Sequence, residues 1–272
     1  MPTPRLAICF LTTGDITHLE AWERWWQGHE HQIKVYAHFS KRGKISQDIL
    51  LQNRVTPVPT RWGDISLVKA EAQLYKRALQ SPKNGAFLLA SAACVPVRSF
   101  NEVYRTTMKD MWRGLVTYRD SPGYAGVDVA PFVPKCQALL DRYGLSRAPC
   151  YACDQWKILS RQNARDFLEM WKDKQYVRLF SAACIKVVPD SLAPDEIMFI
   201  NWLQYKYGSL RKVVRNHVVT YVMFTGDAIH PHNYLRIDKR TAQNMCDTKA
   251  LFARKFQNAS TAVLERSLPI RC

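Results

Sequence analysis

Residues Arg5–Thr12 read RLAICFLT, a short apolar run that ends in polar turn residues and predicts a buried strand. The next segment, His18–Gly28 (HLEAWERWWQG), places its leucine and its tryptophans on one side of a predicted helix. A second strand is predicted at Ile33–Phe39 (IKVYAHF). Strand, helix and strand in this order form a β-α-β unit, whose two strands lie parallel. This stretch therefore decides the fold class.

The same alternation continues along the chain. Leu67–Gln80 predicts a helix that Ser66 can cap, and Ala86–Ala90 predicts a third buried strand. Farther on, the predicted elements are a strand, two helices and a β-rich run: Gln155–Leu159, Arg161–Lys172, Asp195–Tyr207 and His217–Phe224. We expect an α/β fold with a mostly parallel sheet flanked by helices. Ligands of such folds bind outside the carboxyl ends of the strands, which are Thr12–Thr17 and the segment after Leu89.

The composition indicates a globular protein with an anionic partner. The 272 residues carry 39 lysines and arginines against 23 aspartates and glutamates, a formal net charge of +16. Ten of the basic residues, against three aspartates, lie between Tyr205 and Phe256. A charge excess gathered in one region fits an anion-binding site better than a flexible nucleic-acid tail, although nucleic acid stays open as a partner.

Cysteine usage and apolar runs bear on the compartment. The eight cysteines lie mostly inside apolar runs at irregular spacing, which predicts reduced, buried thiols and a cytoplasmic location. Cys150 and Cys153 have the spacing of a zinc or redox hairpin, but a second pair of ligands is missing from the sequence. The apolar stretch Gly85–Val97 is shorter than the roughly 18–20 residues of a membrane span, and the first residues lack a signal-peptide layout. We therefore expect a soluble protein.

Several common chemistries lack their usual motifs. The sequence contains no GxGxxG, no GxxxxGK[ST] and no HExxH, which disfavours dinucleotide oxidoreductases, P-loop nucleotide hydrolases and zincins. It also contains no Asp-x-Asp, the carboxylate pair that holds a divalent ion on the diphosphate in most nucleotide-sugar transferases with a Rossmann-like sheet. The one adjacent acidic pair is Asp195-Glu196, at the start of a predicted helix.

Six strings occur in one order between roughly Arg5 and Phe256. They are RWGDISLVKAE (Arg61–Glu71), FLLASAACVPV (Phe87–Val97), DQWKILSRQNA (Asp154–Ala164), APDEIMFINWL (Ala193–Leu203), VVTYVMF (Val218–Phe224) with His230-Pro231 after it, and LFARKF (Leu251–Phe256). Together they resemble the core-2/I-branching glycosyltransferases, glycosyltransferase family 14, which include peptide O-xylosyltransferases and a plant glucuronosyltransferase-like branch. The resemblance implies a GT-A type Rossmann-like sheet and an inverting transferase that uses a UDP-sugar and no metal ion.

The resemblance also implies roles for charged residues. It places the catalytic base at Glu196, although a carboxylate at a helix N-terminus is also what the helix dipole favours, and Asp195 is expected to cap that helix. Lys255, with Arg254 beside it, is expected to neutralise the diphosphate. A second basic residue does not align cleanly, and Arg215 and Arg236 are candidates for it. The position where a metal-binding carboxylate pair would stand reads Ser91-Ala92-Ala93-Cys94, which cannot hold a divalent cation.

Further residues are expected at the two substrates. For the nucleotide, the matching positions are Phe10, Leu11, Thr12, Thr13, His38, Arg61, Trp62 and Ser66; for the sugar or acceptor, they are Ser91, Asp154, Gln155, Trp156 and Asp195. An indole face packs well on a pyranose, which suits Trp156 to this role, but a core tryptophan is an equal reading. His38 has the same alternative, as a buried histidine with its own hydrogen-bond partners.

These observations predict one domain over residues 1–272, with a nucleotide-binding half at about 1–110 and an acceptor and catalytic half at about 111–272. The predicted activity is transfer of a sugar, xylose or N-acetylglucosamine, from a UDP-sugar to a glycan hydroxyl, with no metal and no other cofactor. A basic nucleic-acid-binding protein and an inactive lectin-like relative are the alternatives. A steep salt dependence of nucleic-acid binding would favour the first, and sugar binding without UDP release the second.

Overall fold

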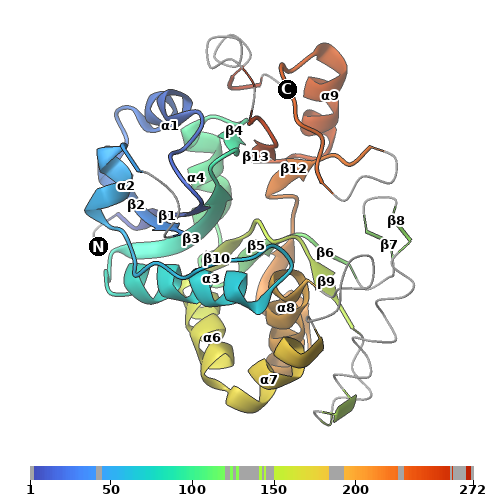
Figure 1. The fold of residues 1–272 in the computed structure, drawn as a ribbon. Helices are drawn as coiled ribbons and strands as arrows, with labels where there is room; N and C mark the ends of the chain where they lie inside the picture. The colour runs from blue at the N-terminus through green and yellow to red at the C-terminus, as the bar shows by residue number, and fades with distance from the viewer. Residues whose placement is uncertain are drawn as a thin grey trace.

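The computed structural model describes residues 3–40, 45–119, 123–124, 127–128, 141–142, 144, 150–183, 193–225, 230–257, 259 and 268–270 (Figure 1). A six-stranded sheet with the order β11-β5-β10-β3-β1-β2 lies at the centre. Its strands are β1 (Arg5–Thr12), β2 (Ile33–Phe39), β3 (Asn84–Ser91), β5 (Gly114–Val116), β10 (Ile158–Ser160) and β11 (Val214–Asn216). Neighbouring strands are parallel except at β10, which is antiparallel to both β3 and β5. The expected α/β class and mostly parallel sheet are confirmed.

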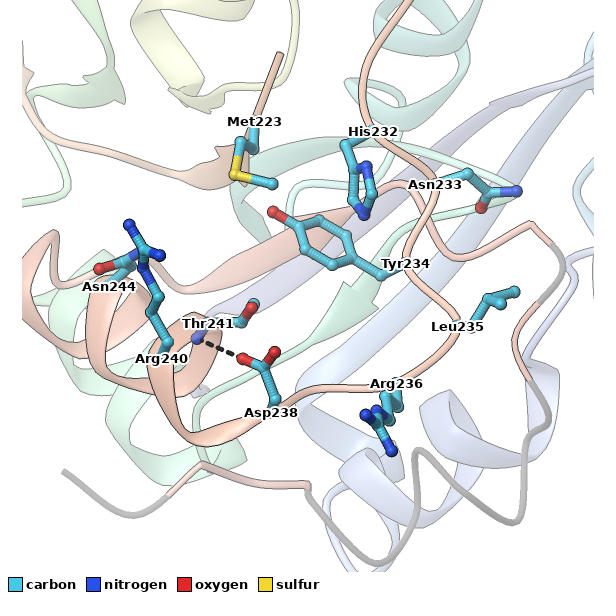
Figure 2. Close-up of a pocket in the computed structure, with 10 residues that line it drawn as sticks. All are labelled: Met223, His232, Asn233, Tyr234, Leu235, Arg236, Asp238, Arg240, Thr241 and Asn244. Carbon is cyan, nitrogen blue, oxygen red and sulfur yellow. Dashed lines mark hydrogen bonds between the residues drawn. The ribbon is translucent and has the colours of Figure 1, made fainter. Parts of the chain in front are cut away.

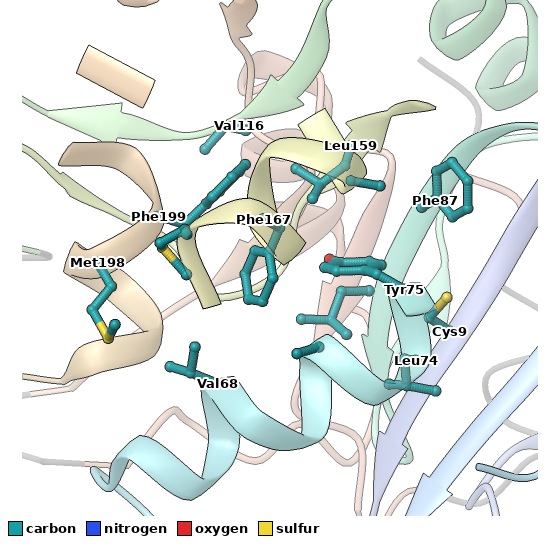
Figure 3. Close-up of a cluster of buried hydrophobic side chains, with 14 of the residues drawn as sticks. Cys9, Val68, Leu74, Tyr75, Phe87, Val116, Leu159, Phe167, Met198 and Phe199 are labelled. Carbon is teal, nitrogen blue, oxygen red and sulfur yellow. The ribbon is translucent and has the colours of Figure 1, made fainter. Parts of the chain in front are cut away.

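Both faces of the sheet are covered, so the adjacent strands β1 and β3 are buried along most of their length. On one face, Leu6, Ile8 and Phe10 of β1 pack with α1 (Leu19–Trp26), α2 (Asp48–Gln52) and α4 (Phe100–Met108). On the other face, Ala7 and Cys9 pack with α3 (Ile65–Ala78), α6 (Arg161–Lys172) and α8 (Pro194–Tyr207). The helix α7 (Lys174–Ala183) follows α6 on this side, and Figure 3 shows the shared core with Tyr75 of α3 and Phe167 of α6.

The strand register brings the carboxyl ends of three parallel strands to one edge. Leu11 of β1 is paired with His38 of β2 on one side and with Ser91 of β3 on the other. Because parallel strands all end at the same edge, residues that are far apart in sequence become neighbours there. This is the edge at which the sequence predicts ligand binding.

A second sheet joins the C-terminal part of the chain to this edge. It has the order β12-β13-β4, formed by Thr220–Val222, Phe252–Arg254 and Val95–Pro96. The amide of Phe256 donates to the carbonyl of Ala93 at 3.1 Å, just after β3. The helix α9 (Lys239–Asp247) precedes β13. The C-terminal residues of the last matching string are thus tied to the turn that follows β3 (Figure 1).

The remaining elements are short. Two small antiparallel pairs form, β6 with β9 and β7 with β8, from Tyr118–Arg119, Ala152–Cys153, Gly123–Tyr124 and Val127–Asp128. Two 3-10 turns, η1 and η2, lie at Glu30–Gln32 and Leu210–Lys212.

Two expected helix caps are wrong. The helix α3 begins at Ile65, and its N-cap is Asp64, whose carboxylate accepts from the amide of Ser66 at 2.8 Å. The helix α8 begins at Pro194, a residue suited to the first helical position because it has no amide hydrogen to leave unpaired. Its N-cap is Ala193, and no described side chain caps this end. Asp195 is therefore the second residue inside the helix rather than its cap.

The cysteines fall into two groups. Among the described cysteines, Cys9, Cys94 and Cys153 are free and buried, as expected. Cys150 and Cys246 are disulfide-bonded, so the expectation of reduced thiols is wrong for them. Disulfides persist mainly in oxidising compartments, and the cytoplasmic expectation loses the thiol argument on which it rested. Within the described part of the chain, no helix has the length and apolarity needed to cross a membrane.

Candidate active site

The site is built around the tight turn that follows β3. The amide of Cys94 donates to the carbonyl of Ser91 at 3.2 Å, and the Ser91 hydroxyl lies 3.2 Å from the Cys94 sulfur. Burial raises the pKa of the Cys94 thiol, although the nearby Arg254 charge opposes this shift. The turn from Ser91 to Cys94 contains no carboxylate. The positive charge beside it comes from the protein's own C-terminal strand.

That strand places Arg254 and Lys255 at the edge of the sheet. Arg254 is the last residue of β13, and its guanidinium lies 4.5 Å from the centre of the Trp156 ring. The next residue, Lys255, is fixed through its backbone, because its carbonyl accepts from the amide of Tyr234 at 2.8 Å. Two cationic residues next to each other in sequence are thus held by backbone pairing beside the turn after β3.

The segment before β10 carries the next group of expected residues. The amide of Asp154 donates to the carbonyl of Thr117 at 2.9 Å, and its carboxylate lies 3.5 Å from the guanidinium of Arg119. Burial raises the pKa of Asp154, while Arg119 opposes the shift. Trp156 is only 6% exposed and belongs to the core shared by α3, α6 and α8. In this structure its ring faces Arg254, so the core reading applies and the sugar contact stays a prediction.

The first turn of α8 holds Glu196 next to this segment. The Asn201 side chain bonds to the backbone of Tyr151 in both directions, at 2.9 Å and 2.8 Å, and so fastens α8 to the chain before β9. Glu196 is half-buried, and its charge helps to raise the pKa of the buried Cys153 thiol, for which burial is the main cause. A carboxylate there also lies at the positive end of the helix dipole.

A buried ion pair lies behind this turn and was not expected from the sequence. The Lys157 ammonium is 2.9 Å from a Glu71 oxygen, and both side chains are completely buried. The ammonium also donates to the carbonyl of Gln155 at 3.0 Å. The sequence does contain a signal for this buried pair. Glu71 stands among the apolar positions of its helix, and Lys157 follows Trp156 in a segment predicted to be a buried strand. Charged residues at such positions are rarely fully buried unless they are paired.

Of the residues expected at the nucleotide, those on the strands are mainly buried. Phe10 is fully buried, and its ring centre lies 5.1 Å from that of Trp22, so its side chain serves the core. His38 is also fully buried and accepts from the amide of Val58 at 2.8 Å through Nε2, and burial lowers its pKa to about 4. His38 is thus a buried histidine with its own hydrogen-bond partner, which is the alternative given above for this residue. Thr13, one residue beyond β1, is exposed at the strand edge.

Near the strand edge, Leu11 and Thr12 are nearly buried, and the Thr12 hydroxyl bonds to the backbone of Gly14. Such local bonds fix the turn after β1.

The loop before α3 also reaches the C-terminal part of the chain. The amide of Arg61 donates to the Ser66 hydroxyl at 3.0 Å, and the Arg61 guanidinium pairs with Asp64 at 3.1 Å. Trp62 is 57% exposed, and its ring lies 5.7 Å from that of His230. This loop therefore presents an exposed indole next to the segment that leads to β13.

The two further basic candidates lie elsewhere. Arg215 donates to the carbonyl of Thr106 at 2.7 Å, in the last turn of α4, and Asp110 and Arg113 are its charged neighbours. Its guanidinium is thus engaged beside α4, and its role as a diphosphate ligand stays a prediction. Arg236 lines a pocket instead.

That pocket has a volume of about 520 Å³ and lies between the end of β12 and α9 (Figure 2). Its residues are Met223, His232, Asn233, Tyr234, Leu235, Arg236, Asp238, Arg240, Thr241 and Asn244. The Tyr234 ring forms its buried wall, while Asp238 is engaged as the N-cap of α9 through the amide of Thr241 at 2.8 Å. Because Tyr234 also pairs with the backbone of Lys255, the pocket adjoins the basic pair.

No group of three or more histidine, cysteine, aspartate or glutamate side chains lies together within the described ranges in a way that could hold a metal ion.

Three comparisons place the chain among known proteins. Glycosyltransferase BC10 from Oryza sativa subsp. japonica is 24% identical over 188 residues, which cover 66% of this chain and 43% of the rice protein. The chain therefore spans less than half the length of this relative. The crystal structure of a glycosyltransferase involved in the glycosylation of the major capsid of PBCV-1 has a TM-score of 0.43, 11% identity and coverage of 95% and 96%. Apo mouse xyloside xylosyltransferase 1 has a TM-score of 0.44, 5% identity and coverage of 94% and 99%.

The family comparison covers nearly the whole chain. The model of the Core-2/I-Branching enzyme family matches residues 6–246. This range includes five of the six strings that carry the resemblance and leaves only the string around Arg254 outside it. The chain therefore belongs to the Core-2/I-Branching enzyme family.

Proposed function

We propose that the protein transfers a sugar from a UDP-sugar to a glycan hydroxyl with inversion at the anomeric carbon and without a metal ion. The observation that carries this proposal is the position of Arg254, between the turn after β3 and the Trp156 ring. Fixed cations at that edge of a parallel sheet suit the diphosphate of a nucleotide-sugar. With Lys255 beside it, Arg254 would stabilise the charge that develops on the departing UDP.

Glu196 is the proposed general base. Its carboxylate takes the proton of the acceptor hydroxyl, and the hydroxyl oxygen forms a bond to the anomeric carbon. The bond from that carbon to the UDP oxygen breaks on the opposite face, and its electron pair leaves with UDP. A half-buried carboxylate in the first turn of α8 suits this step, because it is partly accessible and its helix is fastened to Tyr151 through Asn201.

The substrates are assigned more coarsely. Thr13, Arg61 and Trp62 are the exposed residues of the expected nucleotide set and would contact the uridine. Xylose and N-acetylglucosamine are the donor sugars to test first. The acceptor is a glycan, and the pocket at Tyr234 and Arg240 adjoins the basic pair on the side where an acceptor could extend.

The test is a panel of UDP-sugars with EDTA present throughout, followed by UDP release and by thermal stabilisation of the protein. We expect stabilisation by UDP and release from one donor. Glu196→Gln should abolish release and keep UDP binding, whereas Arg254→Gln should weaken UDP binding. Sugar binding without UDP release would instead favour the lectin-like alternative, and loss of turnover with EDTA would overturn the metal-free mechanism.

A further inference from the structure

Asp195 is a buried carboxyl group that no structural role described above explains. It is the second residue of α8 and is 7% exposed, and it does not cap the helix. One of its oxygens, Oδ1, is buried and has no hydrogen-bond partner among the described residues. Burying an unpaired carboxylate costs several kcal/mol, so such a group calls for a reason.

Its charged neighbours come from two other elements. Lys157, in the segment before β10, and Glu71, on α3, form the buried pair with a separation of 2.9 Å. The Tyr75 hydroxyl donates to the same Glu71 oxygen at 2.8 Å, and Figure 3 shows Tyr75 in the core beneath. The other Glu71 oxygen is buried without a partner in the described chain. The charge of the Lys157 ammonium therefore acts on two buried carboxyl groups, those of Glu71 and Asp195, but the ammonium contacts only Glu71.

In this arrangement Lys157 pairs with Glu71, and Asp195 is the second carboxyl group of the cluster. Burial opposes the charge of Lys157, but its contact with Glu71 raises its pKa above the ordinary value. Burial is the main cause that raises the pKa of Asp195 to about 6; Lys157 lowers it and Glu71 raises it. The other titratable groups around the cluster are the Tyr75 hydroxyl, the Cys9 and Cys153 thiols, Asp154 and Glu196. Lys157 is consequently the charged side chain that favours the ionised form of Asp195, against burial and Glu71.

Asp195 directly precedes Glu196 in the first turn of α8. A negative charge held close to a carboxylate disfavours a second negative charge and favours protonation. We propose that Asp195 is a positioning residue that keeps negative charge behind Glu196, is itself held ionised by the buried Lys157, and thereby favours proton uptake by Glu196. This inference rests on the proposed role of Glu196 as the general base.

The first test compares kcat and KM of Asp195→Asn with those of the wild type between pH 5 and 8. We expect kcat at pH 7 to fall about tenfold, because a weaker base accepts the proton less readily. The KM for the donor should stay unchanged, and the acid limb of the profile should move to lower pH. Asp166→Asn is the matched control, since Asp166 is also a buried aspartate but lies on α6, where it pairs with Lys206. Asp166→Asn should leave the acid limb of the pH profile at its wild-type position.

The second test removes the counter-charge of Asp195. In Glu71→Gln with Lys157→Met, the ion pair is replaced by neutral groups of similar size, so no single buried charge is left behind. Asp195 then holds its proton to higher pH, so that below this pH it is neutral and Glu196 is as weak a base as in Asp195→Asn. We expect the acid limb of the double variant to move to lower pH and kcat at pH 7 to fall, as in Asp195→Asn, and kcat to recover only where Asp195 ionises at higher pH. A wild-type profile in the double variant, with Asp195 still protonated, would overturn the proposal.

A third measurement separates this proposal from the proposed function. Carboxyl ¹³C NMR of labelled glutamate follows the titration of Glu196 in the free protein, without substrate. The midpoint of Glu196 should be lower in Asp195→Asn than in the wild type. An unchanged midpoint overturns the role of Asp195, whereas a wild type that releases UDP from no donor overturns the proposed function and leaves this midpoint to decide the other question.

Discussion

Two clusters of the molecule are built from the same kinds of side chain but differ in their surroundings. Each has one lysine, two carboxylates and a tyrosine: Lys157 with Glu71, Asp195 and Tyr75, and Lys206 with Asp166, Glu169 and Tyr207. In both, the ammonium also lies over an aromatic ring, at 5.9 Å from Phe167 and 5.7 Å from Tyr207. They differ in burial and in how completely their oxygens are bonded.

The Lys206 cluster is fully bonded and partly open to solvent. Lys206 reaches both Asp166, at 2.9 Å, and Glu169, and the Tyr207 hydroxyl and the Gln162 amide supply further donors to Asp166. In the Lys157 cluster, one oxygen of Glu71 and one of Asp195 lack partners in the described chain. A saturated cluster stabilises the fold, whereas an incomplete one beside a candidate base retains a proton-binding group. The comparison teaches that incomplete bonding, and not the presence of an ion pair, distinguishes the Lys157 cluster beside the proposed base.

The largest difference is expected from removing each lysine. Lys157→Met leaves Glu71 buried and charged, which should lower the free energy of unfolding by about 3–5 kcal/mol. Lys206→Met leaves Asp166 with its tyrosine and amide donors, and should lower it by about 1 kcal/mol. Urea unfolding at pH 7 measures both. Equal losses would show that burial does not distinguish the clusters.

Replacing each aspartate by asparagine should change the free energy of unfolding in opposite directions. The pKa of Asp195 is raised from 3.8 to about 6 on folding, so its contribution to stability is present below pH 3.8 and is lost as the pH rises through 6. Asp195→Asn removes this loss and should raise the free energy of unfolding at pH 7 by up to about 3 kcal/mol, with no gain near pH 4. Asp166→Asn should lower it at pH 7 by about 1–3 kcal/mol, because it weakens bonds from a charged partner. Unfolding series from pH 4 to 7 test both signs, and destabilisation by Asp195→Asn at pH 7 would contradict the comparison.

The tyrosine hydroxyls provide a smaller contrast. Tyr75 donates to Glu71 in the interior, so Tyr75→Phe deprives a buried carboxylate of a donor and should cost about 2 kcal/mol. Tyr207 donates to Asp166 near solvent, where water can replace the hydroxyl, and Tyr207→Phe should cost about 0.5 kcal/mol. Thermal unfolding of the two variants gives the comparison. The reverse order would mean that water reaches the inner cluster.

Salt should produce the smallest effect. At 1 M salt the Debye length is about 3 Å, so the coupling between Lys206 and Glu169 should fall by a few tenths of a kcal/mol. The coupling between Lys157 and Glu71 should not change, since both side chains are completely buried. Double-mutant cycles at 0.1 M and 1 M salt measure each coupling. Salt dependence of the inner pair would show that its burial is incomplete in solution.

Long periodic elements could be predicted from the sequence almost to the residue. Arg5–Thr12, Ile33–Phe39 and Arg161–Lys172 have the expected bounds. The last of these helices is fixed by a capping box between Ser160 and Asn163, a local signal. The strands β5 and β11 have three residues each and too few alternations to show a period. Tertiary pairing decides where they lie.

The site could be predicted in part for a similar reason. The motif around Arg254 predicts a cation at the sheet edge, and β13 brings it to the turn after β3. The sequence could not predict that Arg254 covers the Trp156 ring, since that contact joins a strand of the second sheet to the segment before β10. Nor could it place Asp195 in the Lys157 cluster, because helix start and burial are settled by packing against α3 and β9.

The position of β13 has a consequence for how the protein is made. The strand β4 pairs with β13, which lies far later in the chain, so β4 stays without this partner until the ribosome has released the C-terminal residues. Pairings of such sequence separation form late and slowly. A chain interrupted before Phe252 would have the strands β1, β2 and β3 but not the basic pair. The proposed activity can therefore arise only after β13 has been synthesised, and a product truncated before Phe252 would lack the proposed diphosphate site.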